Sequence, residues 1–207
     1  MSKRNKAGIP SHLSLGDALR VAVELHRRGA LDDAQTLYRR VLRLAPRNAD
    51  ANHFLGVLLH QKGRSEEAWP LIERSLAVNG KLADWHSNAG NVLLEMGRLD
   101  EAAQAYQRSA ELAPERADIQ NNIGVLRRAQ KRPEEAEAAY RRAIELDPSF
   151  ADAHNNLGNL LSDWGRTEES LDEYRQALKL KPGHAGARKM LGIGYYALGQ
   201  IEKAAEV

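Results

Sequence analysis

Apolar residues recur every three or four positions along most of this chain, which is the spacing of amphipathic α-helices. Short polar stretches containing glycine or proline separate the apolar segments. One predicted helix, AHNNLGNLL (153–161), carries three asparagines within five residues. Asparagine is a poor helix former because its amide competes for nearby backbone groups. These asparagines therefore need an explanation other than helix propensity.

The helical pattern repeats every 34 residues. Four successive segments align without gaps: NADANHFLGVLLHQKG (48–63), LADWHSNAGNVLLEMG (82–97), RADIQNNIGVLRRAQK (116–131) and FADAHNNLGNLLSDWG (150–165). A second apolar pattern follows each of them, so the sequence predicts helix pairs. We expect a basic, flexible tail over residues 1–14, followed by repeats at 15–48, 49–82, 83–116, 117–150, 151–184 and, in part, 185–207.

The period and its landmark residues resemble the tetratricopeptide repeat family. With Leu15 counted as position 1, small residues recur at positions 8 and 20, a bulky residue (usually tyrosine) at position 24 and mostly proline at position 32. The position-8 residues are Ala22, Gly56, Gly90, Gly124, Gly158 and Gly192. The resemblance implies an all-α fold over 15–207, a single right-handed α-solenoid of stacked antiparallel helix pairs.

Turn and cap residues agree with this prediction, with a few departures. A glycine ends most first helices, where a left-handed residue is expected. Ser65 and Thr167 are expected to cap second helices, and Pro133 to lie in a first turn. Lys131 replaces the helix-ending glycine, so we expect strain or a different turn there. Pro70 lies several residues into a second helix, which it can bend.

Placed on the repeat, the asparagines form rows. Position 6 holds Asn88, Asn122 and Asn156, and position 2 holds Asp84, Asp118 and Asp152. Residues four apart share a helix face, and first helices line the concave wall in the family that this sequence resembles. Asn121 and Asn155 at position 5, with Asn91 and Asn159 at position 9, are expected to border the same groove.

Two interpretations of the asparagine row remain open. An amide offers a donor and an acceptor, as a peptide unit does, so a row of amides can hold an extended peptide by its backbone. The Asp/Asn pattern of the third to fifth repeats is similar to that of the repeat arm of O-linked N-acetylglucosamine transferase, which leads protein substrates toward a catalytic domain. Alternatively, the amides join neighbouring repeats and contact no ligand.

Composition excludes several kinds of site. The chain has no cysteine, which excludes disulfides, thiolate catalysis and cysteine-ligated metals. No apolar run is long enough for a signal peptide or a membrane helix, so we expect a soluble, cytoplasmic protein. Residues 1–48 hold ten Lys or Arg against four Asp or Glu, but the net charge is only +2, and we predict no nucleic-acid or membrane partner.

No cofactor, metal or catalytic residue is predicted. GIGYYA (192–197) matches a dinucleotide fingerprint but falls inside an expected helix, where it cannot bind pyrophosphate. His26, His53 and His60 have no third ligand at metal-binding spacing, and we expect them to face solvent.

The sequence favours a non-enzymatic scaffold that binds an extended polypeptide through the Asn/Asp rows. One alternative is the substrate-recognition arm of a larger enzyme, such as a glycosyltransferase, whose catalytic domain follows residue 207. Another is a homo-oligomer formed through the last repeat, because the sequence stops within its second helix. We expect that stop to leave Leu191, Tyr195, Leu198 and Ile201 uncovered.

Overall fold

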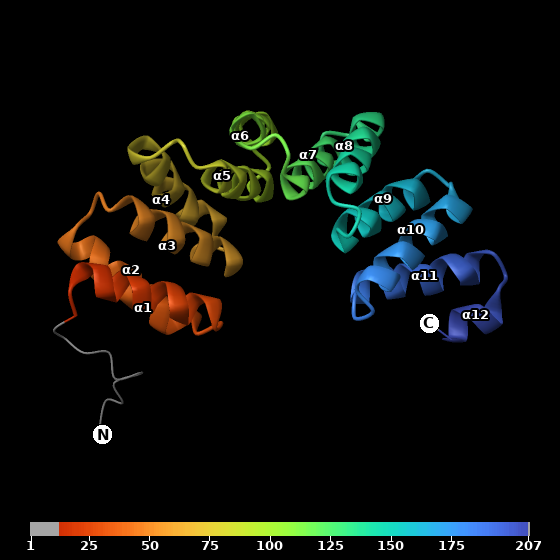
Figure 1. Cartoon of the computed structure of the whole chain (residues 1–207), viewed down its shortest axis with the longest axis horizontal. Coiled ribbons are helices and arrows are strands. Elements are labelled where there is room, and N and C mark those ends of the chain that lie inside the picture. The colour runs from red at the N-terminus through yellow and green to blue at the C-terminus, as the bar shows by residue number, and fades with distance from the viewer. Residues whose placement is uncertain (1–12, 207) are drawn as a thin grey trace, which may run out of the picture. The chain divides into compact units, whose positions relative to one another are not determined.

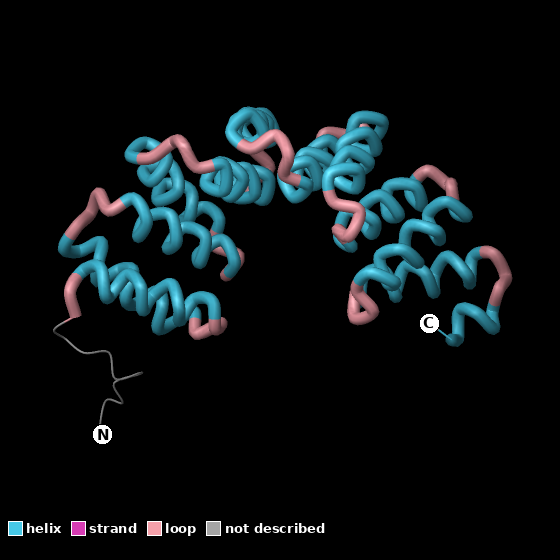
Figure 2. Tube along the Cα trace, in the orientation of Figure 1, coloured by secondary structure: helices cyan, strands magenta, loops and turns pink. Residues whose placement is uncertain are grey.

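The computed structural model describes residues 13–206, which form twelve α-helices and no strand (Figures 1 and 2). The predicted basic tail falls almost entirely on residues 1–12, outside the described residues. The first helices of the repeats are α1 (Leu15–Arg27), α3 (Ala49–Gln61), α5 (Ala83–Glu95), α7 (Ala117–Ala129), α9 (Ala151–Asp163) and α11 (Ala185–Ala197). The second helices are α2 (Leu31–Leu44), α4 (Ser65–Val78), α6 (Leu99–Leu112), α8 (Pro133–Leu146), α10 (Thr167–Leu180) and α12 (Ile201–Glu206).

Helix starts follow the sequence period. Every first helix begins at position 1 of its repeat and every second helix at position 17, so equivalent helices start 34 residues apart. The expected all-α fold of helix pairs is therefore confirmed. None of the described helices is long and apolar enough to cross a membrane.

Contacts between helices divide the chain into two compact units. The first unit extends to Ala105 and holds α1–α5 with the start of α6. The second unit begins at Tyr106 and holds the rest of α6 with α7–α12. The boundary lies inside one helix, and a single solenoid over 15–207 stays a prediction.

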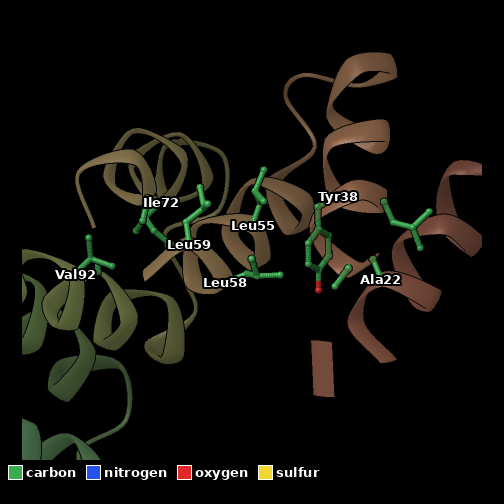
Figure 3. Close-up of a cluster of buried hydrophobic side chains, with 11 residues drawn as sticks. Ala22, Tyr38, Leu55, Leu58, Leu59, Ile72 and Val92 are labelled. Carbon is green, nitrogen blue, oxygen red and sulfur yellow. The ribbon is translucent and has the colours of Figure 1, made fainter. Parts of the chain in front are cut away.

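Each core is built from small residues of first helices and bulky residues of second helices. In the first unit, Tyr38 and Ile72 are fully buried among Ala22, Leu55 and Leu58 (Figure 3). In the second unit, Tyr140 and Tyr174 fill the equivalent place. A Cβ atom added to Gly124 would lie 2.5 Å from the Tyr140 ring, and one on Gly158 would lie 2.7 Å from the Tyr174 ring. The small residues at position 8 are thus required by close helix packing.

The turns that end the first helices confirm the glycine prediction. The glycines there have φ between +70° and +77°, a conformation that costs glycine little. They are Gly29, Gly63, Gly97, Gly165 and Gly199. Lys131 keeps the same turn with φ +58°, so the expected strain is present rather than a different turn. Pro70 leaves α4 continuous from Ser65 to Val78.

The cap prediction for the second helices was wrong by one residue. Ser65 and Thr167 are the first helical residues, and the preceding arginines occupy the N-cap positions without a side-chain cap bond. Each arginine instead forms an ion pair with the glutamate three residues later, which lies near the positive end of the helix dipole. The four pairs are Arg64–Glu67, Arg98–Glu101, Arg132–Glu135 and Arg166–Glu169. Pro133 starts α8, as expected.

Candidate functional site

The Asp and Asn rows lie on first helices and are divided between the two units. Asp84, Asn88 and Asn91 lie on α5 in the first unit. The remaining predicted residues lie on α7 and α9 in the second unit: Asp118, Asn121, Asn122, Asp152, Asn155, Asn156 and Asn159. Asp84 and Asp152 are exposed, and the other members except Asn121 are half-buried. Most of the predicted side chains are therefore partly accessible to a ligand.

Asn88 is bonded to the preceding repeat. Its amide nitrogen Nδ2 lies 3.1 Å from Nε2 of His53 on α3. An amide N–H can only donate, so Nε2 accepts and the proton of the neutral imidazole is on Nδ1, which is buried and has no hydrogen-bond partner among the described residues. This contact uses the donor side of the Asn88 amide and fixes its orientation, while the amide oxygen takes no part in it.

His53 is buried, which contradicts the expectation that it faces solvent. Its exposed fraction is 2%, and its ring stacks on Trp85 with centroids 4.4 Å apart and an interplanar angle of 8°. Burial lowers the pKa of His53 to about 4, although the negative charge of Asp84 acts in the opposite direction. His53 is therefore part of the packing between the second and third repeats, which a search for metal ligands in the sequence cannot show.

Asn156 makes the equivalent contact in the second unit. Its Nδ2 donates to Oδ1 of Asn121 on α7 over 2.9 Å, and its own Oδ1 accepts a long, 3.4 Å bond from Nδ2 of Asn155. Asn121 is only 7% exposed, and Oδ1 of Asn155 is buried with no hydrogen-bond partner. Asn121 therefore orients the Asn156 amide from the preceding repeat, and only part of the predicted set is presented at the surface.

Four polar contacts between neighbouring first helices share one offset: a residue pairs with the residue one position further along the next repeat. The two asparagine contacts join position 5 to position 6. Two other pairs join position 12 to position 13: His26 Nε2 with Gln61 Oε1 at 2.8 Å, and Arg128 with Asp163 at 2.5 Å. All four pairs are 35 residues apart in sequence. The 34-residue alignment does not show this offset.

The other polar residues of the rows also have neighbours. Asp118 forms an ion pair with Arg116, and Asp152 lies 3.1 Å from His184 Nε2 and 3.8 Å from Lys181 Nζ. Asn159 accepts a 2.9 Å hydrogen bond from the buried Tyr174 hydroxyl. A basic ligand group would have to compete with Arg116 at Asp118 and with His184 and Lys181 at Asp152.

Two cavities each include the residue at position 2 of a repeat, Asp50 in one and Asp118 in the other. One, of about 510 Å³, lies between α1 and α3 in the first unit. Its lining combines apolar and charged side chains: Leu19, Arg20, Val23, Glu24, Arg27, Asp50 and Phe54. The other, of about 320 Å³, lies beside Asp118 and Arg116 in the second unit and is lined by both charged and apolar side chains. Phe54 occupies position 6, where the third to fifth repeats have asparagine.

An apolar surface lies on α11 and α12. A cavity of about 670 Å³ there is lined in part by Lys189, Ile193 and Tyr196, and the last two are 50% and 70% exposed. Leu198 and Ile201 are exposed as predicted, but Leu191 is buried with 5% exposure, so the expectation that it is uncovered was wrong. Ile193 and Tyr196 were not predicted to be exposed, because their outward direction depends on how α11 is rotated about its axis.

Signals for other chemistry do not come together in the structure. Gly192 and Gly194 of the dinucleotide-like motif lie inside α11, away from any helix start. Within residues 13–206, His, Asp and Glu side chains form no group of three that could hold a metal ion.

Comparison with known protein families identifies the chain. Family models described as tetratricopeptide repeat match residues 19–81 and 87–151, and a further one matches 139–172. The chain belongs to the tetratricopeptide repeat family. Repeats of this family form protein-interaction scaffolds, and the helix pairs of this chain are tetratricopeptide repeats in sequence and in structure. A comparison with curated protein sequences gave no match.

Solved structures of other tetratricopeptide repeat proteins share the fold. PilF of Pseudomonas aeruginosa superposes with a TM-score of 0.77 at 20% identity, over 93% of this chain and 87% of PilF. A thermophilic tetratricopeptide repeat protein of Thermus thermophilus gives 0.76 at 20% identity, over 88% and 100%. YrrB, described as a tetratricopeptide repeat protein with an unusual peptide-binding site, gives 0.64 at 24% identity, over 84% and 90%. At these identities the likeness concerns the fold alone.

Proposed function

We propose that this protein is a scaffold that binds extended polypeptide segments on the first-helix faces of its units. The ligand backbone would bond to the position-6 amides, Asn88 in the first unit and Asn122 and Asn156 in the second. The position-2 carboxylates would favour basic or hydroxylated residues beside them. Asn91, Asn155 and Asn159 would supply further polar contacts.

The observation that carries this proposal is the way the position-6 amides are held. Asn88 and Asn156 each use Nδ2 for a bond to the preceding repeat, yet both side chains remain partly exposed. A fixed amide loses less conformational entropy when a ligand binds than a free one does. The two interpretations of the asparagines are therefore compatible: Nδ2 joins the repeats, and the amide oxygen, which in Asn156 accepts only a long 3.4 Å bond from Asn155, can accept a further bond from a peptide. One structural neighbour, YrrB, is itself described as peptide-binding.

The test begins with selection of ligands from a display library of random peptides, about 12 residues long, against the whole protein. An extended chain advances about 3.3 Å per residue, so a peptide of this length spans about 40 Å. Selected peptides are then titrated by fluorescence anisotropy against the wild type and the triple variant Asn88→Ala, Asn122→Ala and Asn156→Ala. We expect the triple variant to keep its helical circular dichroism and to bind at least about tenfold more weakly. Unchanged affinity would leave the amides as ties between repeats only.

Asn121→Ala is the matched control for loss of the inter-repeat bond. It removes the partner of Asn156 but leaves the exposed amide in place, because Asn121 itself is buried. We expect Asn121→Ala to reduce peptide affinity much less than Asn156→Ala. Equal losses in the two variants would show that stability of the contact between repeats, and not contact with the ligand, controls binding.

A second candidate function, self-association, is favoured by the exposed Ile193 and Tyr196 beside the α11–α12 cavity. Exposed apolar patches of this kind are typical of interaction sites. Light scattering should show a dimer that the double variant Ile193→Glu and Tyr196→Glu converts to a monomer. A monomeric wild type at high concentration would remove this candidate.

A further inference from the structure

The cavity between α1 and α3 differs from the amide rows in its chemistry. Leu19, Val23 and Phe54 give it an apolar wall, and each of these side chains is only partly buried. Phe54 stacks on the buried ring of Tyr38 with centroids 6.2 Å apart, which holds its ring in place. The cavity therefore has a rigid aromatic side chain at the row position where other repeats have an amide.

Two charges of opposite sign border this cavity without ion-pair partners of their own. Arg20 is paired with Asp17, and Glu24 is paired with Arg28. Within residues 13–206, Arg27 of α1 and Asp50 of α3 form no ion pair, and both are exposed. The cavity thus presents a cation on the α1 side and an anion on the α3 side.

We propose that this cavity binds one bulky apolar side chain of the peptide ligand, with an acidic ligand residue beside Arg27 and a basic one beside Asp50. This proposal rests on the proposed function and gives it a ligand class: an apolar anchor between opposite charges. Ligand charges that complement Arg27 and Asp50 favour one orientation of the peptide in the cavity and disfavour the reverse orientation. The apolar anchor supplies affinity because it is removed from water against Leu19, Val23 and Phe54.

Helix geometry sets the spacing of the ligand charges. Arg27 is at position 13 of its repeat and Asp50 at position 2, so with a rise of about 1.5 Å per residue they are offset by about 16 Å along the direction of the helix axes. An extended chain advances about 3.3 Å per residue, so about five ligand residues cover this span. The acidic and basic residues of the ligand should therefore be about four to six positions apart with the apolar residue between them.

The test uses the same random peptide library with the whole protein and with Phe54→Asn. This variant places at position 6 the residue that the third to fifth repeats carry, so it introduces a side chain that this position of the repeat accepts elsewhere in the fold. Wild-type selection should enrich peptides with an apolar residue between an acidic and a basic one. Phe54→Asn should bind those peptides at least about tenfold more weakly. Replacing the apolar ligand residue by serine should have the same effect on the wild type.

Arg27→Glu is the second variant, and it keeps the proposal testable if Phe54→Asn does not fold. Arg27 is exposed, so its charge can be reversed without disturbing the core. Arg27→Glu should select peptides in which the acidic residue is replaced by a basic or neutral one. Leu44→Ser, which removes a 68% exposed apolar side chain at the end of α2, is the control and should leave selection unchanged.

The outcomes separate this inference from the proposed function. Failure of the library to yield any peptide for the wild type would overturn the proposed function and this inference with it. Peptides that depend on Asn88 or Asn156 but show no apolar anchor, and bind Phe54→Asn and Arg27→Glu as tightly as the wild type, would overturn this inference alone.

Discussion

Asn156 donates a 2.9 Å hydrogen bond to Asn121, which lies one position earlier on the preceding repeat. Asn88 and His53 are related in the same way in the first unit. In both pairs, the residues that bond are not the residues that a 34-residue alignment places in one column. The neighbouring first helices are displaced by one residue, and this displacement decides which polar side chains meet.

The Asn121–Asn156 bond should contribute to stability as a coupled pair. Asn121→Ala and Asn156→Ala should each lower the free energy of unfolding. The double variant should lower it by less than the sum of the two single losses, with a coupling energy of about 1 kcal/mol. Urea denaturation followed by circular dichroism measures the four free energies of unfolding. Asn121→Ala combined with Arg175→Ala, whose ion pair is with Asp172, is the control and should be additive. Additive effects for Asn121 and Asn156 would contradict the bond.

The glycine at position 8 should not tolerate a methyl group. A Cβ atom on Gly124 would lie 2.5 Å from the buried Tyr140 ring, so Gly124→Ala should destabilise by about 1–3 kcal/mol despite the higher helix propensity of alanine. Gly16→Ala is the control, because that helical glycine has open space around its Cα. It should be neutral or stabilising by up to about 1 kcal/mol. Thermal denaturation compares the two, and similar shifts of both midpoints would refute the packing argument.

Replacing Lys131 by glycine should stabilise the protein. The φ of +58° at Lys131 costs a residue with a Cβ atom about 1–2 kcal/mol, and glycine removes most of that cost. The greater freedom of glycine in the unfolded chain offsets part of the gain, so Lys131→Gly should stabilise by about 1 kcal/mol or less. The reverse change at the equivalent turn, Gly63→Ala, should destabilise. A loss of stability in Lys131→Gly, measured by urea denaturation, would show that its side chain contributes contacts outweighing the strain.

Acid should weaken the packing between the second and third repeats. The pKa of His53 is about 4 in the folded protein and 6.5 when exposed, so the unfolded chain binds the proton first. Stability is then fully present above about pH 6.5 and is lost as the pH falls toward 4, by about 3 kcal/mol at most. His53→Asn, which copies the Asn121 residue of the fourth repeat, should lose this dependence. Denaturation midpoints between about pH 4 and pH 8 measure it, and equal slopes for both proteins would contradict it.

His154 should respond to pH in the opposite direction. Its Nδ1 lies 2.7 Å from Glu173 Oε2, and this hydrogen bond raises the pKa of His154 above 6.5. A raised pKa gives stability that is present below pH 6.5 and lost as the pH rises through the folded value. Glu173→Gln should therefore destabilise at about pH 6 and have a smaller effect at about pH 9. An effect that does not change with pH would show that the pair acts without charge.

The fold could be predicted from the sequence because its determinants are local. Glycine at the turns and small residues at position 8 recur at the fixed period, and the helices begin where that period places them. The Lys131 strain was predictable for the same reason, since the turn is set by its neighbours.

The polar contacts could not be predicted, because they depend on how one repeat is placed against the next. Nothing local to His53 shows that Trp85 covers it or that Asn88 bonds to it. The N-cap positions of the arginines before the second helices were not predicted, because arginine is not a usual capping residue. Their side chains form ion pairs with glutamates three residues later instead of capping the helix end. Phe54 could not be predicted as part of a binding site, because its cavity requires α1 as the second wall.

The one-residue displacement also affects the order in which the repeats can be joined. Asn88 bonds to a histidine and Asn156 to an amide, so asparagine at position 6 accepts different neighbours. The pairs at positions 12 and 13 restrict the neighbouring repeat more strongly. His26 bonds to the Gln61 amide and Arg128 to the Asp163 carboxylate, and other residue types at position 13 would not replace these bonds. With the fourth repeat in place of the second, His26 would meet Ala129 and lose its bond. Shuffled repeats would keep every helix but not every contact between repeats. These side-chain pairs therefore favour the natural order of the repeats over other orders.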